Sequence, residues 1–429
     1  MVYFIEIVIL FVLCLMLSPV RNKSVALLWT LQFLTLFLSP LVANHVIFSS
    51  VWTAFNIFFC FVNLYLITAP WGYAQFQELL IRRWNFFLFY KRVLYIVLSV
   101  TILINLVVWV VVMIFIPDIS HFKASLGYTE LYDSVPYFGL LFRYASVTRY
   151  IGLMAMPIAM YYVSVGKNKE AIKAAIMSSA TLIAALAFYS RAQIFVYTLL
   201  WVCLYMFSRS ILDMPKRMQL DKYLKTFAFS ILAVFMIITY SRFTAMDYYG
   251  DRIPKESVIK NPIMYSIIDY STKGFINGIN QLEVHESSDV LKGEQTYYDL
   301  FMVLSYFHFI PWTTDAAAYR AARAYDKNGL NEGNDSGTFH GYTCRMVKDY
   351  GYVLTVLIDL LFFFYVRNKT RGRKKMNLTD LTVLLFLMVQ SINSFFYSTY
   401  STVIFPLLFY IGIRFIYILL SPILIRNGK

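Results

Sequence analysis

The sequence predicts an all-α protein that crosses a membrane many times, and three observations indicate this fold class. Hydrophobic residues make up 59% of the 429 positions and charged residues only 14%, which is not the balance of a soluble domain of this size. Apolar stretches of about 20 residues, the length that spans a bilayer, recur along the chain. The basic residues cluster between these stretches. We therefore expect about 11 transmembrane helices, within a range of roughly 10–12, in one integral membrane domain over residues 1–429.

The expected helices follow the apolar stretches from the N-terminus. The first stretch contains Glu6 and has no basic segment before it, so we interpret it as a retained span rather than a cleaved signal. The predicted spans are residues 2–20, 25–43, 46–69, 93–116, 144–165, 173–189, 192–208, 225–241, 351–366, 378–395 and 402–420.

The distribution of charge sets the expected orientation. Six segments that fall on one side of the predicted membrane hold 22 Lys and Arg residues, whereas the loops in which they lie contain only four acids: Glu78, Glu170, Asp213 and Asp221. By the positive-inside rule this side is the cytoplasm, so we expect the N-terminus outside and the C-terminus inside. The net charge of +14 therefore reflects topology and does not predict a nucleic-acid partner. The six segments are residues 21–23, 82–92, 167–173, 209–225, 367–375 and 426–429.

One large external loop is expected between the eighth and ninth spans, at about residues 241–350. It holds 11 basic and 14 acidic residues, and all five histidines of the chain fall on the external side. The apolar run Tyr297–Pro311 predicts a short re-entrant or interfacial helix. An Ala-rich helix is expected over Ala316–Lys327. It places three cations on one helix face: Arg320, Arg323 and Lys327.

Arg191 interrupts an otherwise apolar run from Ala174 to Ser208. A single helix over this run would be about 50 Å long, far more than the ~30 Å of bilayer hydrocarbon. We therefore expect two helices with a tight turn at Ser190–Arg191. A permanent charge near the membrane surface needs an anionic partner, so this arginine is a candidate diphosphate ligand, or otherwise an interfacial arginine that reaches toward water.

The segment from Ser336 to Gly351 (SGTFHGYTCRMVKDYG) closes the large loop and leads into a span. It resembles the matching segment of bacterial O-antigen and capsule repeat-unit polymerases (the Wzy type), in which a turn is followed by a short helix, an acid, an aromatic or small residue and a glycine that opens the next span. It is also similar to the related O-antigen ligases, where a catalytic histidine precedes the acid and glycine at the spacing of His340, Asp349 and Gly351. Ser190-Arg191-Ala192 resembles a Ser-Arg-small signature of the polymerases.

The resemblance implies an enzyme of the bacterial inner (plasma) membrane that joins undecaprenyl-diphosphate-linked oligosaccharide repeat units into O-antigen or capsular polysaccharide. Such an enzyme transfers the growing glycan to the next lipid-linked unit, with polyprenyl diphosphate as leaving group. A flippase and a chain-length regulator are its expected partners besides membrane lipids. No cofactor and no metal are expected, since the sequence has no Asp-x-Asp pair and no His/Cys cluster with metal spacing.

This chemistry assigns roles to the external polar residues. The attacking hydroxyl must lose a proton, which makes His340 the candidate catalytic base, and Asp349 a second catalytic candidate that is expected to orient an arginine four residues before it. The developing charge on the diphosphate suits guanidinium groups. Each arginine also has a purely structural interpretation, as an interfacial anchor, a solvated helix face or a partner of Asp349. The candidate diphosphate ligands are Arg191, Arg242, Arg320, Arg323 and Arg345.

Two other functions compete with the polymerase. His340 fits an O-antigen ligase, which uses the same donor but a lipid A core as acceptor. A flippase for lipid-linked oligosaccharides would also handle the same lipid, but transporters usually show internal repeats and several mid-span charges. We find no repeat, and take Glu6 and Asp359 as the only mid-span acids.

Overall fold

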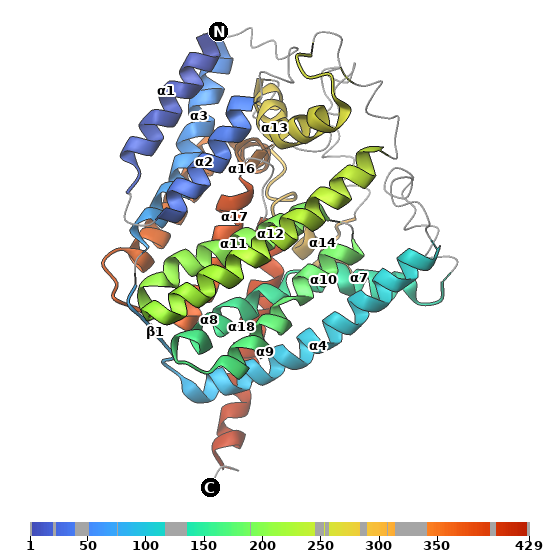
Figure 1. Cartoon of the computed structure of the whole chain (residues 1–429). Helices are drawn as coiled ribbons and strands as arrows, with labels where there is room; N and C mark the ends of the chain where they lie inside the picture. The colour runs from blue at the N-terminus through green and yellow to red at the C-terminus, as the bar shows by residue number, and fades with distance from the viewer. Residues whose placement is uncertain are drawn as a thin grey trace. The chain divides into compact units, whose positions relative to one another are not determined.

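The structure is a computed structural model of the whole chain (Figure 1). It is mostly helical, with one pair of short strands among the residues that it describes. The chain forms two compact units, each made of separate stretches of sequence. Unit 1 comprises Met1–Gln75, Met246–Arg373 and Met388–Ser401, and unit 2 comprises Phe76–Ala245, Lys374–Leu387 and Thr402–Lys429. The described residues are 2–19, 23–38, 51–74, 76–115, 135–188, 190–244, 253, 257–283, 290–306, 308–313, 341–394 and 400–426.

Six helical segments of the described chain have the length and apolar composition that a membrane span needs. Two shorter apolar helices, Ile5–Leu17 and Leu378–Asn393, also coincide with predicted spans. The expectation of an all-α, membrane-type protein is thus confirmed, while the count of eleven spans stays a prediction. The six segments are Ala54–Tyr73, Trp84–Phe115, Asn168–Ala187, Gln193–Ile211, Gly341–Thr370 and Val403–Ser421.

Unit 1 is built around one kinked helix, α16, which packs against α3, α13 and a short 3-10 helix, η2. Trp71 of η2 is fully buried in this unit, and its indole Nε1 donates hydrogen bonds to Ser391 Oγ at 2.8 Å and Ile67 O at 3.0 Å. Its ring meets the ring of Phe362 on α16 edge to face. The elements of unit 1 are α1 (Val2–Leu17), α2 (Lys23–Leu38), α3 (Val51–Thr68), η2 (Ala69–Tyr73), α13 (Pro262–Glu283), α14 (Tyr298–Tyr306) and α16 (Gly341–Thr370).

Helix α13 lies within the predicted large loop, where only short helices were expected. Its start carries a clear signal, because Asn261 Oδ1 accepts hydrogen bonds from the backbone N–H groups of Ile263 and Met264 at 3.0 and 3.1 Å. Pro262 then occupies the first helical position, where its missing N–H is not needed. The short helix expected near Tyr297–Pro311 is present as α14, whereas the one expected at Ala316–Lys327 lies outside the described residues.

Unit 2 holds the long helix α4, which packs against α7, α9 and α10. A buried apolar cluster of Val108, Val112, Phe138, Ala145 and Ala187 joins α4, α7 and α10. The elements are β1 (Glu78–Leu80), α4 (Trp84–Phe115), α7 (Phe138–Thr148), η3 (Ile151–Met154), α8 (Ala155–Ser164), α9 (Asn168–Ser178), α10 (Ala180–Ala187), α11 (Arg191–Ser208), η4 (Arg209–Ile211), α12 (Met214–Thr244) and β2 (Lys375–Asn377), with parts of α17 (Leu378–Asn393) and α18 (Tyr400–Arg426).

The predicted span at residues 144–165 is not one continuous helix. It is divided into the end of α7, the 3-10 turn η3 and α8. Pro157 in the first turn of α8 explains part of the break, because proline has no N–H to bond to residue 153 and its ring crowds that carbonyl. Gly152 in η3 allows close approach to the next helices, since a Cβ there would lie only 2.7 Å from Ser178 O.

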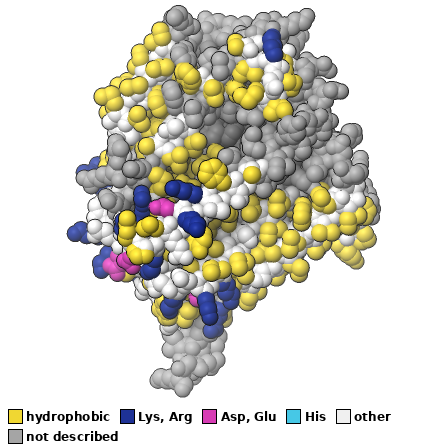
Figure 2. Space-filling view, viewed as in Figure 1, with side chains coloured by type: hydrophobic (Ala, Val, Ile, Leu, Met, Phe, Trp, Pro, Cys, Tyr) yellow, Lys and Arg dark blue, Asp and Glu magenta, His cyan; other side chains and the backbone are white. Residues whose placement is uncertain are grey.

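The basic segments around α4 and α9 contact one another within unit 2. Strand β1 pairs in parallel with β2, and Lys375 Nζ lies 2.9 Å from Glu78 Oε2. Lys91 forms a salt bridge with Glu170 at 3.1 Å, and Ser210 Oγ donates to the carbonyl of Phe76. Figure 2 shows Lys and Arg side chains gathered at the lower left of a described surface that is otherwise largely apolar. The loops that hold four of the six predicted cytoplasmic segments are therefore joined by contacts, two of which are made by residues 76–80, just before the segment 82–92.

Candidate functional site

Residues 341–350 of the sequence segment singled out above form the first arm of α16. The helix begins at Gly341, whose φ of 62° lies in the left-handed region, and it is interrupted at Gly351, where φ is 74° and ψ is 172°. A side chain strains the backbone in both conformations, so glycine suits both positions. The two glycines separate a ten-residue arm, 341–350, from the longer arm that follows, 352–370.

The two arms of α16 are joined through a buried polar contact. The hydroxyl of Tyr342 in the first arm donates a hydrogen bond to Asp359 Oδ1 in the second. Both residues are fully buried. The second carboxyl oxygen, Asp359 Oδ2, is buried without a hydrogen-bond partner in the described structure. Since Tyr342 reaches across the kink, the arms fold back on each other rather than forming one straight rod.

Asp349 lies in the first arm and fastens the segment 290–297 to it. Its Oδ1 accepts a hydrogen bond from the backbone N–H of Gln295 at 3.2 Å, and its Oδ2 accepts from the backbone N–H of Thr296 at 2.6 Å and from the Thr296 hydroxyl. The carboxylate is fully buried. A buried carboxylate that already accepts three hydrogen bonds is well suited to hold a loop in place.

Arg345 acts on the same loop from one helical turn earlier. Its Nη2 donates to the carbonyl oxygen of Gln295 at 2.9 Å. Asp349 and Arg345 therefore bind the backbone N–H and the backbone carbonyl of the same residue. The expected direct pairing of the two side chains is replaced by this shared contact. Arg345 Nε is buried and has no hydrogen-bond partner among the described residues. The guanidinium thus keeps one donor uncommitted.

The structure places the other predicted site residues only in part. Arg191 is the first residue of α11, directly after the N-cap Ser190, which confirms the tight turn expected between two apolar helices. Arg242 lies near the end of α12. The side chains of both arginines lie outside the described structure. So do three whole residues, His340, Arg320 and Arg323, although His340 directly precedes the first arm.

A small cavity lies beside the first arm. Its volume is about 20 Å³, room for about one water molecule, and it is lined by Gln32, Cys60, Tyr342, Cys344 and Ser394 among others. Gln32 Nε2 donates to Ser394 Oγ at 3.0 Å and to Thr68 Oγ1 at 3.2 Å. This size excludes a sugar substrate, so the cavity belongs to the packed interior of unit 1.

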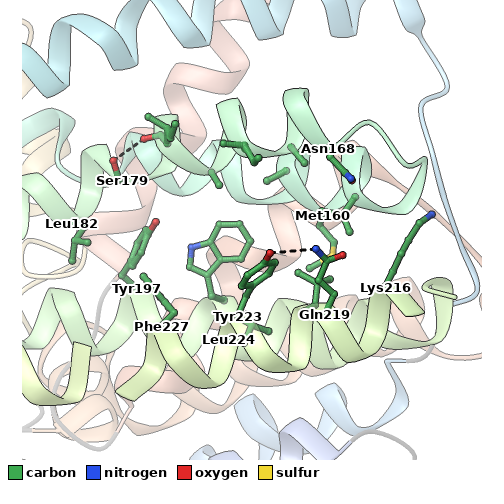
Figure 3. A pocket seen from close by; sticks show the side chains of 18 residues that line it. Met160, Asn168, Ser179, Leu182, Tyr197, Lys216, Gln219, Tyr223, Leu224 and Phe227 are labelled. Carbon is green, nitrogen blue, oxygen red and sulfur yellow. Dashed lines mark hydrogen bonds between the residues drawn. The ribbon is translucent and has the colours of Figure 1, made fainter. Parts of the chain in front are cut away.

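A larger cavity of about 580 Å³ lies in unit 2 between α8, α9, α11 and α12. Figure 3 shows Lys216 and Asn168 at one end, and Tyr197, Ser179 and Leu182 at the other. Most of the lining is apolar, which suits a hydrocarbon chain better than a polar substrate.

Two charged residues of consequence were missed in the sequence. Lys348 is fully buried in the first arm of α16, one residue before Asp349. Arg414 stands in the middle of the apolar helix α18 and lines a pocket. A lone cation within a predicted span is itself a signal that marks a candidate site. No group of three or more His, Cys, Asp or Glu side chains that could hold a metal is found among the described residues.

Comparisons of this chain with protein-family models, with curated proteins and with solved structures give no match. What the site can do must therefore be argued from the residues themselves.

Proposed function

We propose that this chain polymerises undecaprenyl-diphosphate-linked oligosaccharide repeat units at the external face of a bacterial inner membrane. The observation that carries the proposal is the form of α16. A short helix, the acid Asp349, an aromatic residue and a helix-opening glycine at Gly351 follow one another in the order of the polymerase segment. The turn at Ser190–Arg191, which begins α11, is a second feature of the same resemblance.

The contacts among the basic segments support the topology that this function needs. Residues 76–92, 167–173, 209–225 and 374–377 lie together in unit 2 through the pairing of β1 with β2, the Lys91–Glu170 salt bridge and the Ser210–Phe76 hydrogen bond. Segments in mutual contact lie on one side of a membrane. With about 11 spans, the basic side is the cytoplasm, and the loop at about 241–350 is external together with the N-terminus.

In the proposed reaction, a hydroxyl oxygen of the acceptor unit bonds to the anomeric carbon of the donor glycan. The bond from that carbon to the diphosphate breaks, and the diphosphate leaves with the electron pair. His340 accepts the hydroxyl proton, and the guanidinium groups of Arg191, Arg242, Arg320 and Arg323 are the proposed ligands of the leaving diphosphate. No cofactor enters this scheme.

The contacts of Asp349 and Arg345 give these two residues a more specific role. Asp349 is committed to the backbone of Gln295 and Thr296, so we assign it to positioning rather than to proton transfer. Arg345 holds Gln295 with Nη2 while its Nε is buried, so we propose that it mainly orients the loop and that any contact with a phosphate is made by the rest of its guanidinium group.

The test is a reconstituted assay with the purified full chain and undecaprenyl-diphosphate-linked repeat units, in which products are separated by length. We expect a ladder of lengthened glycan with the wild type. His340→Asn should lower the rate by about 10²–10⁴-fold, the usual effect of losing a general base. Arg191→Lys should also impair lengthening, because lysine keeps the charge but loses the planar fork.

Arg92→Lys, an exposed arginine on α4, is the matched control and should be fully active. Absence of any lengthened product from suitable lipid-linked units would contradict the proposal. Transfer of a single unit to a lipid A core would identify a ligase. Transbilayer movement of the lipid without glycan transfer would identify a flippase.

A further inference from the structure

A pocket of about 450 Å³ lies in unit 2 beside the start of α4, between the first turns of α17 and the middle of α18. Three arginines line it: Arg82 and Arg83 from the segment before α4, and Arg414 from α18. In the part of the chain that the structure describes, none of the three forms a salt bridge. Three cations around one pocket without carboxylate partners favour an anionic ligand.

The position of Arg414 within an apolar helix indicates that the ligand lies in or at the membrane. Arg414 lies within Val403–Ser421, one of the segments that have the composition of a membrane span. Its neighbours Ile411, Phe415 and Ile418 expose their apolar side chains, as residues in contact with lipid do. A permanent charge on such a helix is costly without an anion at the same depth, and a lipid headgroup is the anion available there.

The rest of the pocket adds neutral donors and an aromatic wall. Tyr90, which lines it, is 4% exposed, and its hydroxyl is buried without a hydrogen-bond partner in the described structure. The hydroxyl of Tyr410 donates to Thr379 Oγ1 at 3.1 Å. Tyr90 and Phe86 pack edge to face against Tyr410, with ring centroids 5.5 and 6.1 Å apart. The wall is therefore preformed, and Asn377 lines the pocket as a further polar group.

We propose that this pocket binds the headgroup of a membrane lipid that carries two phosphates, with the lipid chains along the exposed apolar face of α18. Three arginines match two phosphates better than one, because each guanidinium offers two parallel donors to a phosphate. Asp380, the acid beside Thr379, does not line the pocket but lies near enough for its charge to act on Tyr410, so the three arginines outnumber the nearby acid, and Glu78 is engaged with Lys375. This binding site shares no residue with the proposed glycan-transfer site, so neither proposal depends on the other.

The experiment is native mass spectrometry of the purified full chain in detergent, titrated with four probes. These are cardiolipin, a polyprenyl diphosphate, phosphatidylglycerol and inorganic pyrophosphate. We expect either two-phosphate lipid to bind at least about tenfold more tightly than phosphatidylglycerol, the effect of one additional charge-assisted hydrogen bond. Comparison of cardiolipin with the polyprenyl diphosphate then identifies the source of the phosphates.

Arg414→Gln should weaken binding of the two-phosphate lipid by about tenfold or more, and Arg82→Gln, at an exposed residue just before α4, provides a second test if the first variant folds poorly. Arg92→Gln removes the same charge from an exposed part of α4 outside the pocket and should bind as the wild type does. Equal losses in Arg82→Gln and Arg92→Gln, equal binding of phosphatidylglycerol, or pyrophosphate binding as tightly as the lipids would each overturn the proposal.

Discussion

The hydroxyl of Tyr342 donates a hydrogen bond to the carboxyl group of Asp359, seventeen residues further along α16 and on the far side of its kink. Neither side chain is exposed. The contact ties the segment that resembles the polymerases to the span that follows it. The geometry of the first arm is therefore set by the second arm as well as by the segment 290–297.

Tyr342→Phe should lower the free energy of unfolding of the purified protein by about 1–3 kcal/mol, because it leaves a buried carboxyl group without its donor. The measurement is thermal unfolding in detergent, followed by circular dichroism. Tyr137→Phe, at a tyrosine that is 81% exposed, is the control and should have little effect. Equal stability of the Tyr342→Phe variant and the wild type would mean that the two arms are held by packing alone.

Gly351→Ala should lower stability by about 1–3 kcal/mol, since an alanine must adopt a conformation reserved for glycine there. Space is not the obstacle, because the nearest atom to an added Cβ is Val290 Cγ2 at 3.9 Å. Gly412→Ala is the matched control, in helical backbone with no atom within 4 Å of the added carbon. It should stabilise by up to about 1 kcal/mol. The measurement is the midpoint temperature of thermal unfolding in detergent. The prediction fails if Gly351→Ala and Gly412→Ala shift this midpoint in the same direction.

Asp349 and Arg345 should be energetically coupled, since both hold Gln295. We expect Asp349→Asn and Arg345→Gln each to lower stability by about 1–3 kcal/mol and the double variant to lose clearly less than the sum. The measurement is a double-mutant cycle of chemical unfolding. Asp213→Asn, at an acid whose side chain is 78% exposed and which lies 3.6 Å from Lys216, should change stability by less than about 0.5 kcal/mol. If the stability losses of the two single variants add up to that of the double variant, the two residues act independently.

The pairing of β1 with β2 predicts a specific cross-link. In the double variant Glu78→Cys with Lys375→Cys, the two thiols occupy directly paired positions, close enough for a disulfide. Mild oxidation should therefore produce a species with altered gel mobility that reductant reverses. The four native cysteines are all buried and serve as internal controls in the wild type. The pair Glu78→Cys with Asn377→Cys, which is offset by two residues in the same register, should not cross-link.

The sequence predicted what depends on local composition. Hydropathy located the apolar helices, and the length argument at Arg191 correctly predicted two helices with a turn at Ser190. These features need only neighbouring residues, which is why they can be derived without a structure.

Contacts between distant parts of the chain could not be predicted in this way. The partners of Asp349 lie 53 and 54 residues before it, in a loop with no motif that points to them. The strands β1 and β2 are only three residues long and almost 300 residues apart, too short for a periodic pattern. Arg414 was overlooked because averaging over a window hides one charge among many apolar neighbours. The N-terminal signal of α13, in contrast, was present in Asn261-Pro262.

The pairing of β1 with β2 also constrains the order in which the parts of the protein can fold during synthesis. Unit 2 starts at Phe76 but is completed by residues 374–387 and 402–429, which the ribosome delivers only after most of unit 1. Until these residues are synthesised, β1 has no partner strand, and the helices from α4 to α12 lack their packing partners in α17 and α18. Unit 1 in turn needs residues 388–401. The two units must therefore mature together at the end of translation, and a chain that stops short of α17 leaves both incomplete.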